Sequence, residues 1–319
     1  MLPSLLRRLL QSLVLIWGVL TLTFFLLQLS PGDPMDRFIS PRIPPETLAQ
    51  IRRQLGFDQP LPLQYLKWLQ QWLQGDWGYS LAQHRPVTQI LAEAIPATLA
   101  LTIPVLALSL VLGIALGAAG AFYRNRWFDR FLSNVILAAY SMPSFWLGLM
   151  VILLFALKLK WLPNSEASSL FAENMDALTA LKDRIRHLLL PMFTLALPGA
   201  AAIARYTREN FITVLESDFI RLARAKGLSP AQLIMRHASP HILLPLISLC
   251  GLSLPFLMGG AFLTEIIFAW PGMGRVTFEA IFSRDYPVVL AATSLSAFTT
   301  IGGNFVADVL YRIADPRIR

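Results

Sequence analysis

The side chains that enzymes use for covalent or metal chemistry are few and scattered in this sequence. Its four histidines are His84, His187, His237 and His241, and only the last two could share a helical face. Pro240 stands between those two, and no cysteine or paired carboxylates accompany them, so the spacing does not predict a metal site. The sequence also lacks a G-x-x-x-x-G-K-[ST] loop, a G-x-S-x-G motif and an H-E-x-x-H motif. We therefore predict no catalytic residue, metal site or cofactor site in this chain.

One polar stretch, residues 218–240, has the pattern of a well-defined local structure. Residues 218–226 have an acidic start and a basic end, as the helix dipole favours. Gly227 suits the left-handed position that ends a helix. Ser229 and Gln232 have the spacing of a capping box for a second helix. We predict two short helices joined at a bend.

This bend lies between two long apolar runs, which would hold it just outside a bilayer. Ala223 and Ala225 are small and would let another surface approach the first helix. Arg221, Arg224 and Lys226 would offer that surface positive charge. The pattern indicates docking to a soluble partner, and the alternative is a solvated basic loop that obeys membrane topology.

The composition is that of a membrane protein. Of 319 residues, 55% are hydrophobic and 14% are charged, and the mean hydropathy is +0.56. The formal net charge of +8 comes from basic residues at the ends of apolar runs, without the basic and aromatic platform of a nucleic-acid-binding protein. The single cysteine, Cys250, lies in an apolar run and excludes an intrachain disulfide.

Six apolar runs predict an all-α integral membrane protein with six transmembrane helices. They cover residues 9–29, 97–122, 132–157, 188–204, 242–268 and 287–311. Arg7 and Arg8 precede the first run and place the N-terminus in the cytoplasm, and an even number of spans returns the C-terminus there. The first run is too long for a signal peptide and lacks a cleavage site, so we predict a retained span.

The predicted organisation has four parts. Residues 1–30 form the first span, 31–95 an extracytoplasmic and largely helical insertion, 96–311 a five-helix core, and 312–319 a cytoplasmic tail. Within the insertion we expect a short helix at residues 45–56 and an amphipathic helix at residues 63–74. The second is rich in aromatic residues, so it would lie on the outer membrane surface or pack on the transmembrane helices.

Three features inside the spans stand out. Gly113, Gly117 and Gly120 would permit close helix contact in lipid. Residues 141–146 interrupt the third span with a proline, as either a simple kink or a bend that lines a pathway. Glu265, near the end of the fifth run, should face protein or water rather than lipid. The turn that follows it holds Trp270, Pro271, Gly272 and Gly274.

Several segments resemble the permeases of dipeptide and oligopeptide ABC importers, and specifically the first of the two permeases that such systems encode. They are L-G-F-D-Q-P-L-P-L-Q-Y-L (55–66), G-D-W-G-Y-S (75–80), S-M-P-S-F-W-L-G (141–148), A-R-A-K-G-L (223–228), T-E-I-I-F-A-W-P-G-M-G (264–274), R-D-Y-P-V-V (284–289) and D-P-R-I-R (315–319). The stretch at 218–240 resembles the loop of such permeases that contacts the ATPase, whose pattern is E-A-A, three residues, Gly, nine residues and I-x-L-P. Only Ala223, Gly227 and Pro240 match that pattern strictly.

The resemblance implies a type-1 ABC importer permease in the bacterial cytoplasmic membrane. Its implied partners are a second permease that completes a heterodimer, two ATP-binding subunits that carry ATP and Mg²⁺, an extracytoplasmic binding protein and the lipid bilayer, and no nucleic acid. The implied ligands are di- and oligopeptides, and the same branch includes nickel and glutathione permeases.

The resemblance also implies site residues. The ATPase-coupling set is Arg221, Leu222, Ala223, Arg224, Ala225, Lys226, Gly227 and Pro240. The pathway set is Ser141, Met142, Pro143, Ser144, Phe145, Trp146 and Glu265. The set for the outer gate or binding-protein docking is Trp270, Pro271, Gly272 and Gly274.

Two other classes of function are compatible with the pattern of spans. A stand-alone channel or secondary transporter would need a coupling-ion site, and the spans hold almost no charge to build one. The other class is a membrane scaffold or an enzyme subunit.

Overall fold

The computed structural model describes residues 2–29, 58–169, 172–229 and 261–314, together with positions 46, 50, 52, 53, 232 and 233. In that part of the chain the fold is helical, and the only β-type pairing is an isolated bridge between Tyr79 and Pro86. Four helices are long and apolar enough to cross a membrane, or five if one bent pair counts as a span. The all-α prediction is confirmed. Most of the predicted fifth span and of the helix at 45–56 lies outside the described residues.

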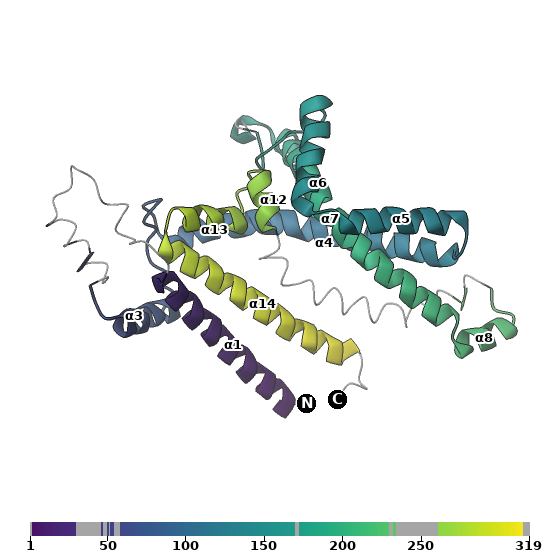
Figure 1. Ribbon diagram of the computed structural model, residues 1–319, viewed down its shortest axis with the longest axis horizontal. Coiled ribbons are helices and arrows are strands. Elements are labelled where there is room, and N and C mark those ends of the chain that lie inside the picture. Colours follow the sequence, from purple (N-terminus) through teal and green to yellow (C-terminus); the bar gives the residue numbers. More distant parts are fainter. Residues whose placement is uncertain are drawn as a thin grey trace.

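The first and last long helices lie side by side. Figure 1 shows α1 (Leu2–Leu29) and α14 (Tyr286–Ala314) as neighbours that run in opposite directions. An ion pair between Arg8 and Asp308 joins them near the N-terminus. The first residue of α1 and the last residue of α14 therefore lie at the same end of this helix pair.

The predicted amphipathic helix is α3 (Leu61–Leu73), and it packs on these two helices. The Tyr65 ring stacks on Phe25 of α1 at a centroid distance of 5.6 Å, and its hydroxyl lies 2.7 Å from the Thr21 hydroxyl. Trp72 stacks on Phe298 of α14 at 5.3 Å. Of the two predicted locations, the structure therefore shows packing on the transmembrane helices.

The centre of the fold is the crossing of α4 (Val87–Phe122) and α7 (Ala177–Leu215). A Cβ added to Gly113 would lie 2.6 Å from Ile203 Cβ, and one added to Gly117 would lie 2.5 Å from the Ala204 carbonyl oxygen. The backbones of α4 and α7 can approach this closely only because glycine stands at these positions. The prediction that these glycines permit close helix contact is confirmed.

The helix α7 is much longer than the predicted span at residues 188–204. Asp176 caps its start by accepting a hydrogen bond from the Thr179 amide at 3.2 Å, and the contacts with Thr179 hold the pKa of the Asp176 carboxyl below its ordinary value. Pro191 and Pro198 lie inside the helix without ending it. The charged residues before residue 188 indicated a loop, yet they form the first part of one continuous helix.

The predicted interruption of the third span is a sharp bend. Helix α5 (Trp127–Ser141) and the segment that begins with α6 (Ser144–Val151) and continues as a π-helix (Ile152–Lys158) meet at 101°. Met142 and Pro143 lie at the break. The described residues also include the short helices α8 (Asp218–Ala225), α12 (Phe262–Ile267) and α13 (Met273–Phe282) and a 3₁₀ turn (Ala172–Asn174).

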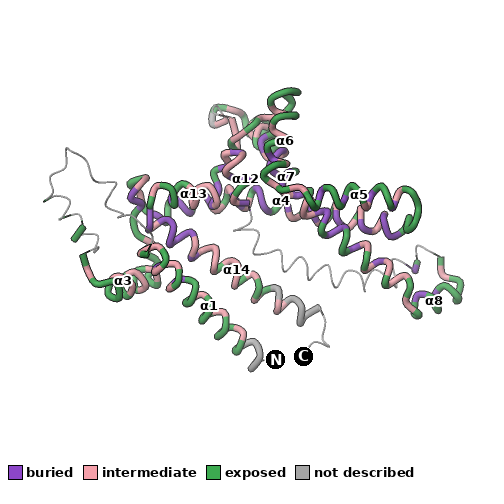
Figure 2. Tube along the Cα trace, viewed as in Figure 1, coloured by how far each residue is buried: buried purple, intermediate pink, exposed green. Residues whose placement is uncertain are grey.

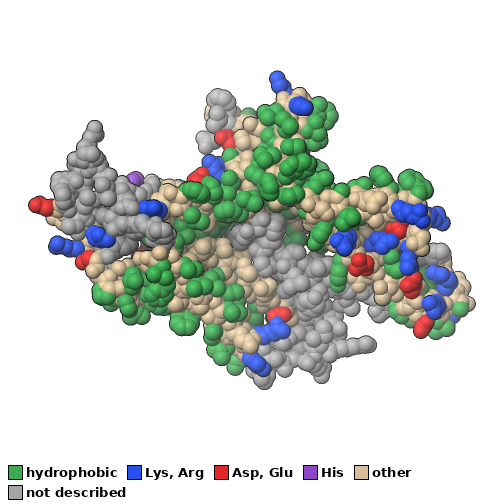
Figure 3. All heavy atoms as spheres, in the orientation of Figure 1, with side chains coloured by type: hydrophobic (Ala, Val, Ile, Leu, Met, Phe, Trp, Pro, Cys, Tyr) green, Lys and Arg blue, Asp and Glu red, His purple; other side chains and the backbone are tan. Residues whose placement is uncertain are grey.

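Burial follows the contacts between helices rather than one central core. Figure 2 shows buried residues along α4, on α13 and at the start of α14, whereas much of α1 and α5 is exposed. Figure 3 shows many of the exposed side chains to be hydrophobic, with Lys and Arg gathered at the end that holds α8 and the start of α5. Apolar helices that expose apolar faces are typical of proteins surrounded by lipid.

Candidate functional site

The bend predicted after residue 226 is present, and we call residues 218–229 the elbow. Gly227 has a φ of +83°, the left-handed conformation that favours glycine, and its amide donates to the Arg224 carbonyl at 3.0 Å. Ser229 and Gln232 form the predicted capping box, because the Gln232 amide donates to Ser229 Oγ at 3.4 Å and the Ser229 amide donates to Gln232 Oε1 at 3.1 Å. Pro240 lies outside the described residues.

Helix α8 divides the predicted coupling residues between two faces. Ile220 and Ala223 are buried in a cluster with Ile203, Phe211 and Leu233. The exposed members of the set are Arg221, Leu222, Arg224, Ala225, Lys226 and Gly227. Ala223 therefore packs on its own chain rather than offering a surface beside Ala225. The physical reason is that positions 220 and 223 share one helical face, which α7 covers.

The exposed face of α8 combines an apolar side chain with positive charges. Leu222 is 59% exposed, and Arg221, Arg224 and Lys226 lie around it. Arg221 reaches back to Asp218 at 3.4 Å in an exposed pair that contributes little stability. These cations therefore remain available to a partner.

Two ion pairs that the sequence analysis missed brace the end of α7 from which the elbow projects. Arg208 donates to both oxygens of Asp129 at 2.8 Å, and the Asn125 amide donates to the same carboxylate at 3.0 Å. Arg124 pairs with Glu216, which lies just before α8. The available signal was Asp129, an acidic residue in the otherwise basic stretch 123–130 that leads from the end of α4 into α5.

The predicted pathway residues around the bend lie mostly at the surface of the chain. Phe145 and Trp146 are 47% and 44% exposed, and Ser141 and Pro143 are also exposed. Met142 and Ser144 are partly buried. Gly148, one turn further along α6, is buried where α6 meets α7 and α12. The bend therefore presents two aromatic rings outward while α6 packs on α7.

The carboxylate of Glu265 is buried, and both of its oxygens accept hydrogen bonds from other residues of the chain. Its Oε1 accepts from the Thr98 hydroxyl of α4 at 2.8 Å. Its Oε2 accepts from the amides of Gly274 and Arg275 at 2.6 and 3.2 Å, at the start of α13. The prediction that Glu265 faces protein or water rather than lipid is confirmed, since it faces protein and is 1% exposed.

The residues after Glu265 form a tight turn between α12 and α13. A Cβ added to Gly272 would lie 2.5 Å from the Glu265 carboxylate, and one added to Gly274 would lie 2.7 Å from the Phe262 backbone. The Trp270 indole donates to the Ala97 carbonyl of α4 at 2.7 Å. We call residues 265–275 the outer turn. It is held to α4 by the hydrogen bonds of Glu265 and Trp270, and Pro271 is the exposed member of the predicted gate set.

A second long-range contact joins two of the segments whose sequences resemble the permeases. Asp285 accepts hydrogen bonds from the Ser80 hydroxyl at 2.5 Å and from the Leu81 and Ala82 amides at 3.1 and 3.0 Å. Ser80 and Asp285 are both buried. This contact attaches the chain just before α4 to the start of α14.

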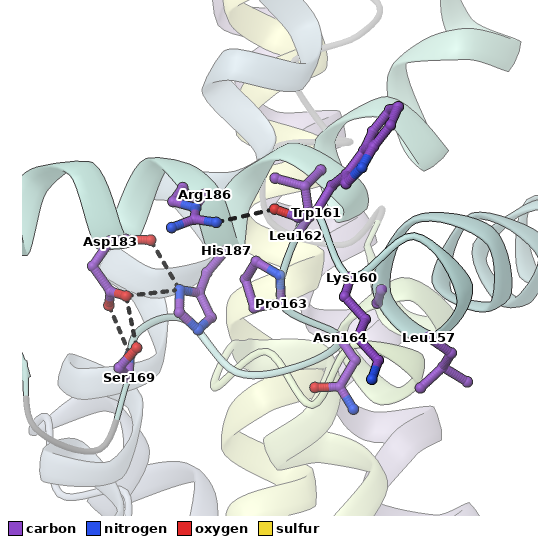
Figure 4. A pocket seen from close by; sticks show the side chains of 11 residues that line it. Leu157, Lys160, Trp161, Leu162, Pro163, Asn164, Ser169, Asp183, Arg186 and His187 are labelled. Carbon is purple, nitrogen blue, oxygen red and sulfur yellow. Dashed lines mark hydrogen bonds and ion pairs between the residues drawn. The ribbon is translucent and has the colours of Figure 1, made fainter.

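A pocket of about 520 Å³ lies between the end of the π-helix and the first part of α7. Figure 4 shows Arg186 donating to the Trp161 carbonyl, at 3.0 Å, and Asp183 bonded to Ser169. The Glu166 amide, in the segment between the π-helix and the 3₁₀ turn, donates to the Phe268 carbonyl at 2.7 Å. This segment therefore contacts the outer turn. In the described residues, no group of three or more His, Cys, Asp or Glu side chains is arranged to hold a metal ion.

Two family profiles match almost the whole chain. The profile described as "Binding-prot-dependent transport system membrane comp, N-term" matches residues 1–102, and "Binding-protein-dependent transport system inner membrane component" matches residues 109–319. The chain is also similar in fold to a chain of the inward-facing MetNI methionine ABC transporter, with a TM-score of 0.56 and 16% identity. That match covers 72% of this chain and 97% of the other.

Individual relatives are similar over their full length. The oligopeptide transport system permease protein AppB of Bacillus subtilis (strain 168) is 37% identical, and 98% of each chain is covered. The di/tripeptide transport system permease protein DppB of Pseudomonas aeruginosa (strain UCBPP-PA14) is 39% identical and covers 100% of this chain and 99% of its own. The glutathione transport system permease protein GsiC of Escherichia coli (strain K12) is 35% identical with the same coverage.

Proposed function

The chain belongs to the family of binding-protein-dependent transport system inner membrane components, and from that premise we propose that it forms part of the pathway for di- and oligopeptides in an ATP-driven importer. It is a multi-pass permease subunit of the inner membrane rather than an enzyme. The observation that carries the peptide assignment is full-length similarity to an oligopeptide permease and a di/tripeptide permease, at 37% and 39% identity.

Glutathione is the second candidate ligand. The relatives named as glutathione permeases are 35–36% identical over the whole chain, close to the values for the peptide permeases. Glutathione is itself a small peptide with free carboxylates. The two candidates therefore require similar chemistry from the pathway.

The proposed assembly contains a sister permease, two ATP-binding subunits that hold ATP and Mg²⁺, and an extracytoplasmic binding protein. The elbow is the proposed contact with an ATP-binding subunit, because its exposed face offers Leu222 among three cations. We place both termini and the elbow in the cytoplasm, since basic residues favour that side. The outer turn and the pocket beside Arg186 then face the binding protein.

The proposed mechanism uses α7 as a rod. When ATP draws the two ATP-binding subunits together, the elbow moves and carries the braced end of α7 with it. Because α7 is continuous from Ala177 to Leu215 and locked to α4 at Gly113 and Gly117, the movement reaches the outer turn that Thr98 and Ala97 fasten to α4. The permease pair opens outward, the binding protein releases its ligand, and hydrolysis resets the pair. Nucleotide drives this change only by binding the two states with different affinity.

Reconstitution tests the proposal. The complex of this chain, its sister permease and both ATP-binding subunits is placed in proteoliposomes, and binding protein is added. It should transport a labelled dipeptide when ATP and Mg²⁺ are present on the side of the membrane that the ATP-binding subunits face. Omission of the ATP-binding subunits should abolish uptake. Uptake by this chain alone would support a channel or secondary transporter and would contradict the proposal.

A further inference from the structure

The half of α7 that leads to α8 carries an arginine whose guanidinium lies against a tyrosine ring of α5. The guanidinium carbon of Arg205 lies 5.3 Å from the centroid of the Tyr140 ring of α5. Both residues are exposed, Tyr140 by 51%. Among the described residues, the ion pairs at this end of the molecule use Arg124, Arg208 and Arg221, and none uses Arg205.

The positions of Tyr140 and Arg205 along their helices limit how far this cation lies from the Asp129–Arg208 ion pair. Helices α5 and α7 are antiparallel, because Asp129 at the start of α5 pairs with Arg208 near the end of α7. Along α5 Tyr140 is about 16 Å from Asp129, whereas along α7 Arg205 is only about 4.5 Å from Arg208, at a rise of about 1.5 Å per residue. The guanidinium therefore lies between these two depths. Side chains of a helix tilt toward its N-terminus, so Arg205 reaches away from the charged end and toward Tyr140. This orientation is the opposite of an arginine that extends back to the membrane surface.

The exposed face of α7 changes character at this point. In residues 188–200 the exposed side chains are the apolar Phe193 and Leu197. From residue 205 onward four exposed side chains are polar: Arg205, Tyr206, Glu209 and Thr213. They follow one helical stripe toward α8, so a polar surface leads inward and ends at Arg205 and Tyr140.

A permanently charged arginine at this depth is costly against lipid and requires water or protein in front of it. The polar stripe that continues to the end of the helix favours water. Tyr140 also directly precedes the bend at residues 141–146, which exposes Phe145 and Trp146. The face that joins α5 and α7 therefore has a cation, aromatic rings and a polar connection to one side of the membrane.

We propose that this face lines the water-filled cavity of the assembled transporter and that Arg205 binds the free carboxylate of the peptide in transit. A guanidinium presents paired donors that match the two oxygens of a carboxylate. The ring of Tyr140 holds the cation in place from one side and leaves its remaining donors to the ligand. The inference rests on the proposed peptide import and adds the chemical group that the pathway recognises.

The test compares two dipeptides in the reconstituted complex. Alanyl-phenylalanine and its C-terminal amide are supplied at increasing concentrations with the same binding protein, and the KM of ATP-dependent uptake is measured for each. For Arg205→Gln, the KM for the free acid should rise about tenfold relative to the KM for the amide, because a charge-assisted contact is lost. Arg205→Lys should restore part of the difference. The difference in affinity of the binding protein for the two dipeptides does not affect the comparison between variants, because the same binding protein is used with all of them.

The chain offers a matched control in Arg126, whose guanidinium carbon lies 5.9 Å from the Tyr123 ring in the turn between α4 and α5. Arg126→Gln removes a similar cation and ring pair outside the cavity and should leave both KM values unchanged. An unchanged ratio of KM values in Arg205→Gln would overturn the inference while wild-type uptake still supports peptide import. Absence of ATP-dependent uptake by the wild type would instead overturn the proposed function.

A second measurement does not depend on uptake by the arginine variants. Ala202 is exposed on α7 one turn before Arg205, and Cys250 is the only native cysteine. In a Cys250→Ser background, Ala202→Cys should react with a charged, membrane-impermeant thiol reagent in the assembled complex. If the cysteine reacts only with a membrane-permeant reagent, or with neither, the face is covered by lipid or by the sister permease, and the inference is wrong.

Discussion

Asp285 and Ser80, separated by 205 positions in the chain, share a buried hydrogen bond of 2.5 Å. The same carboxylate accepts hydrogen bonds from two backbone amides, so it satisfies two donors of the segment that leads into α4. A buried carboxylate with three donors is a strong fastening, because the loss of any donor leaves charge unpaired. Residues 75–80 and 284–289 resembled the same family separately, and the fold brings them into contact.

Asp285→Asn should destabilise this contact. The amide nitrogen of asparagine would face a donor, so we expect a loss of about 1–3 kcal/mol in the free energy of unfolding. Thermal unfolding of the detergent-solubilised complex measures it. Glu93→Gln, which removes only the exposed pair with Arg85, is the control and should have little effect. Equal melting temperatures for the two variants would contradict the role of Asp285.

Gly227→Pro should abolish transport. Proline cannot adopt the φ of +83° found here, and it also removes the amide that donates to Arg224. The measurements are dipeptide uptake and the ATPase activity that depends on transport. Gly227→Ala should cause a milder defect, because its Cβ meets no atom within 4 Å and only the backbone is strained, by about 1–2 kcal/mol.

Gly75→Ala is the matched control for the milder variant. Gly75 has a φ of +82° and equally open surroundings, so the substitution introduces similar strain far from the elbow. Uptake by Gly75→Ala should stay close to that of the wild type. Survival of both uptake and coupled ATPase activity in Gly227→Pro would show that the elbow does not transmit the motion.

Glu265→Gln should impair uptake without preventing assembly. The glutamine side chain offers one acceptor oxygen where the carboxylate offers two, so the outer turn loses a contact with either Thr98 or the start of α13. Size-exclusion chromatography tests assembly, and initial rates of uptake test function. Glu279→Gln, at an exposed pair with Arg275, is the control. Uptake kinetics identical to the wild type would remove Glu265 from the pathway set.

Gly117→Ala should separate α4 from α7. The added methyl group would lie 2.5 Å from the Ala204 carbonyl oxygen, which cannot move without shifting the helix. We expect a lower melting temperature, corresponding to about 1–3 kcal/mol, as for other overpacked contacts. Gly302→Ala, with no atom within 4 Å of the new methyl group, should be neutral or slightly stabilising. A neutral Gly117→Ala would contradict the close crossing.

Local patterns in the sequence were sufficient to predict the elbow and most of the described helices, although not the length of α7. The spans follow from apolar length, and the bend at Gly227 and the Ser229–Gln232 capping box follow from short-range backbone chemistry. Such features depend on neighbours within a few residues, which the sequence displays directly. The family resemblance was readable for the same reason, since its motifs are continuous segments.

Only the tertiary structure decided which partner each side chain has. Ala223 turned inward because α7 covers that face of α8, and Glu265 turned to the amides of α13 and to Thr98. The pairs Asp129–Arg208 and Ser80–Asp285 join residues far apart in the chain, and Arg205 meets Tyr140 only because α5 and α7 are antiparallel. Contacts of this kind depend on how helices cross, and periodicity along one helix does not determine the neighbour against which its face packs.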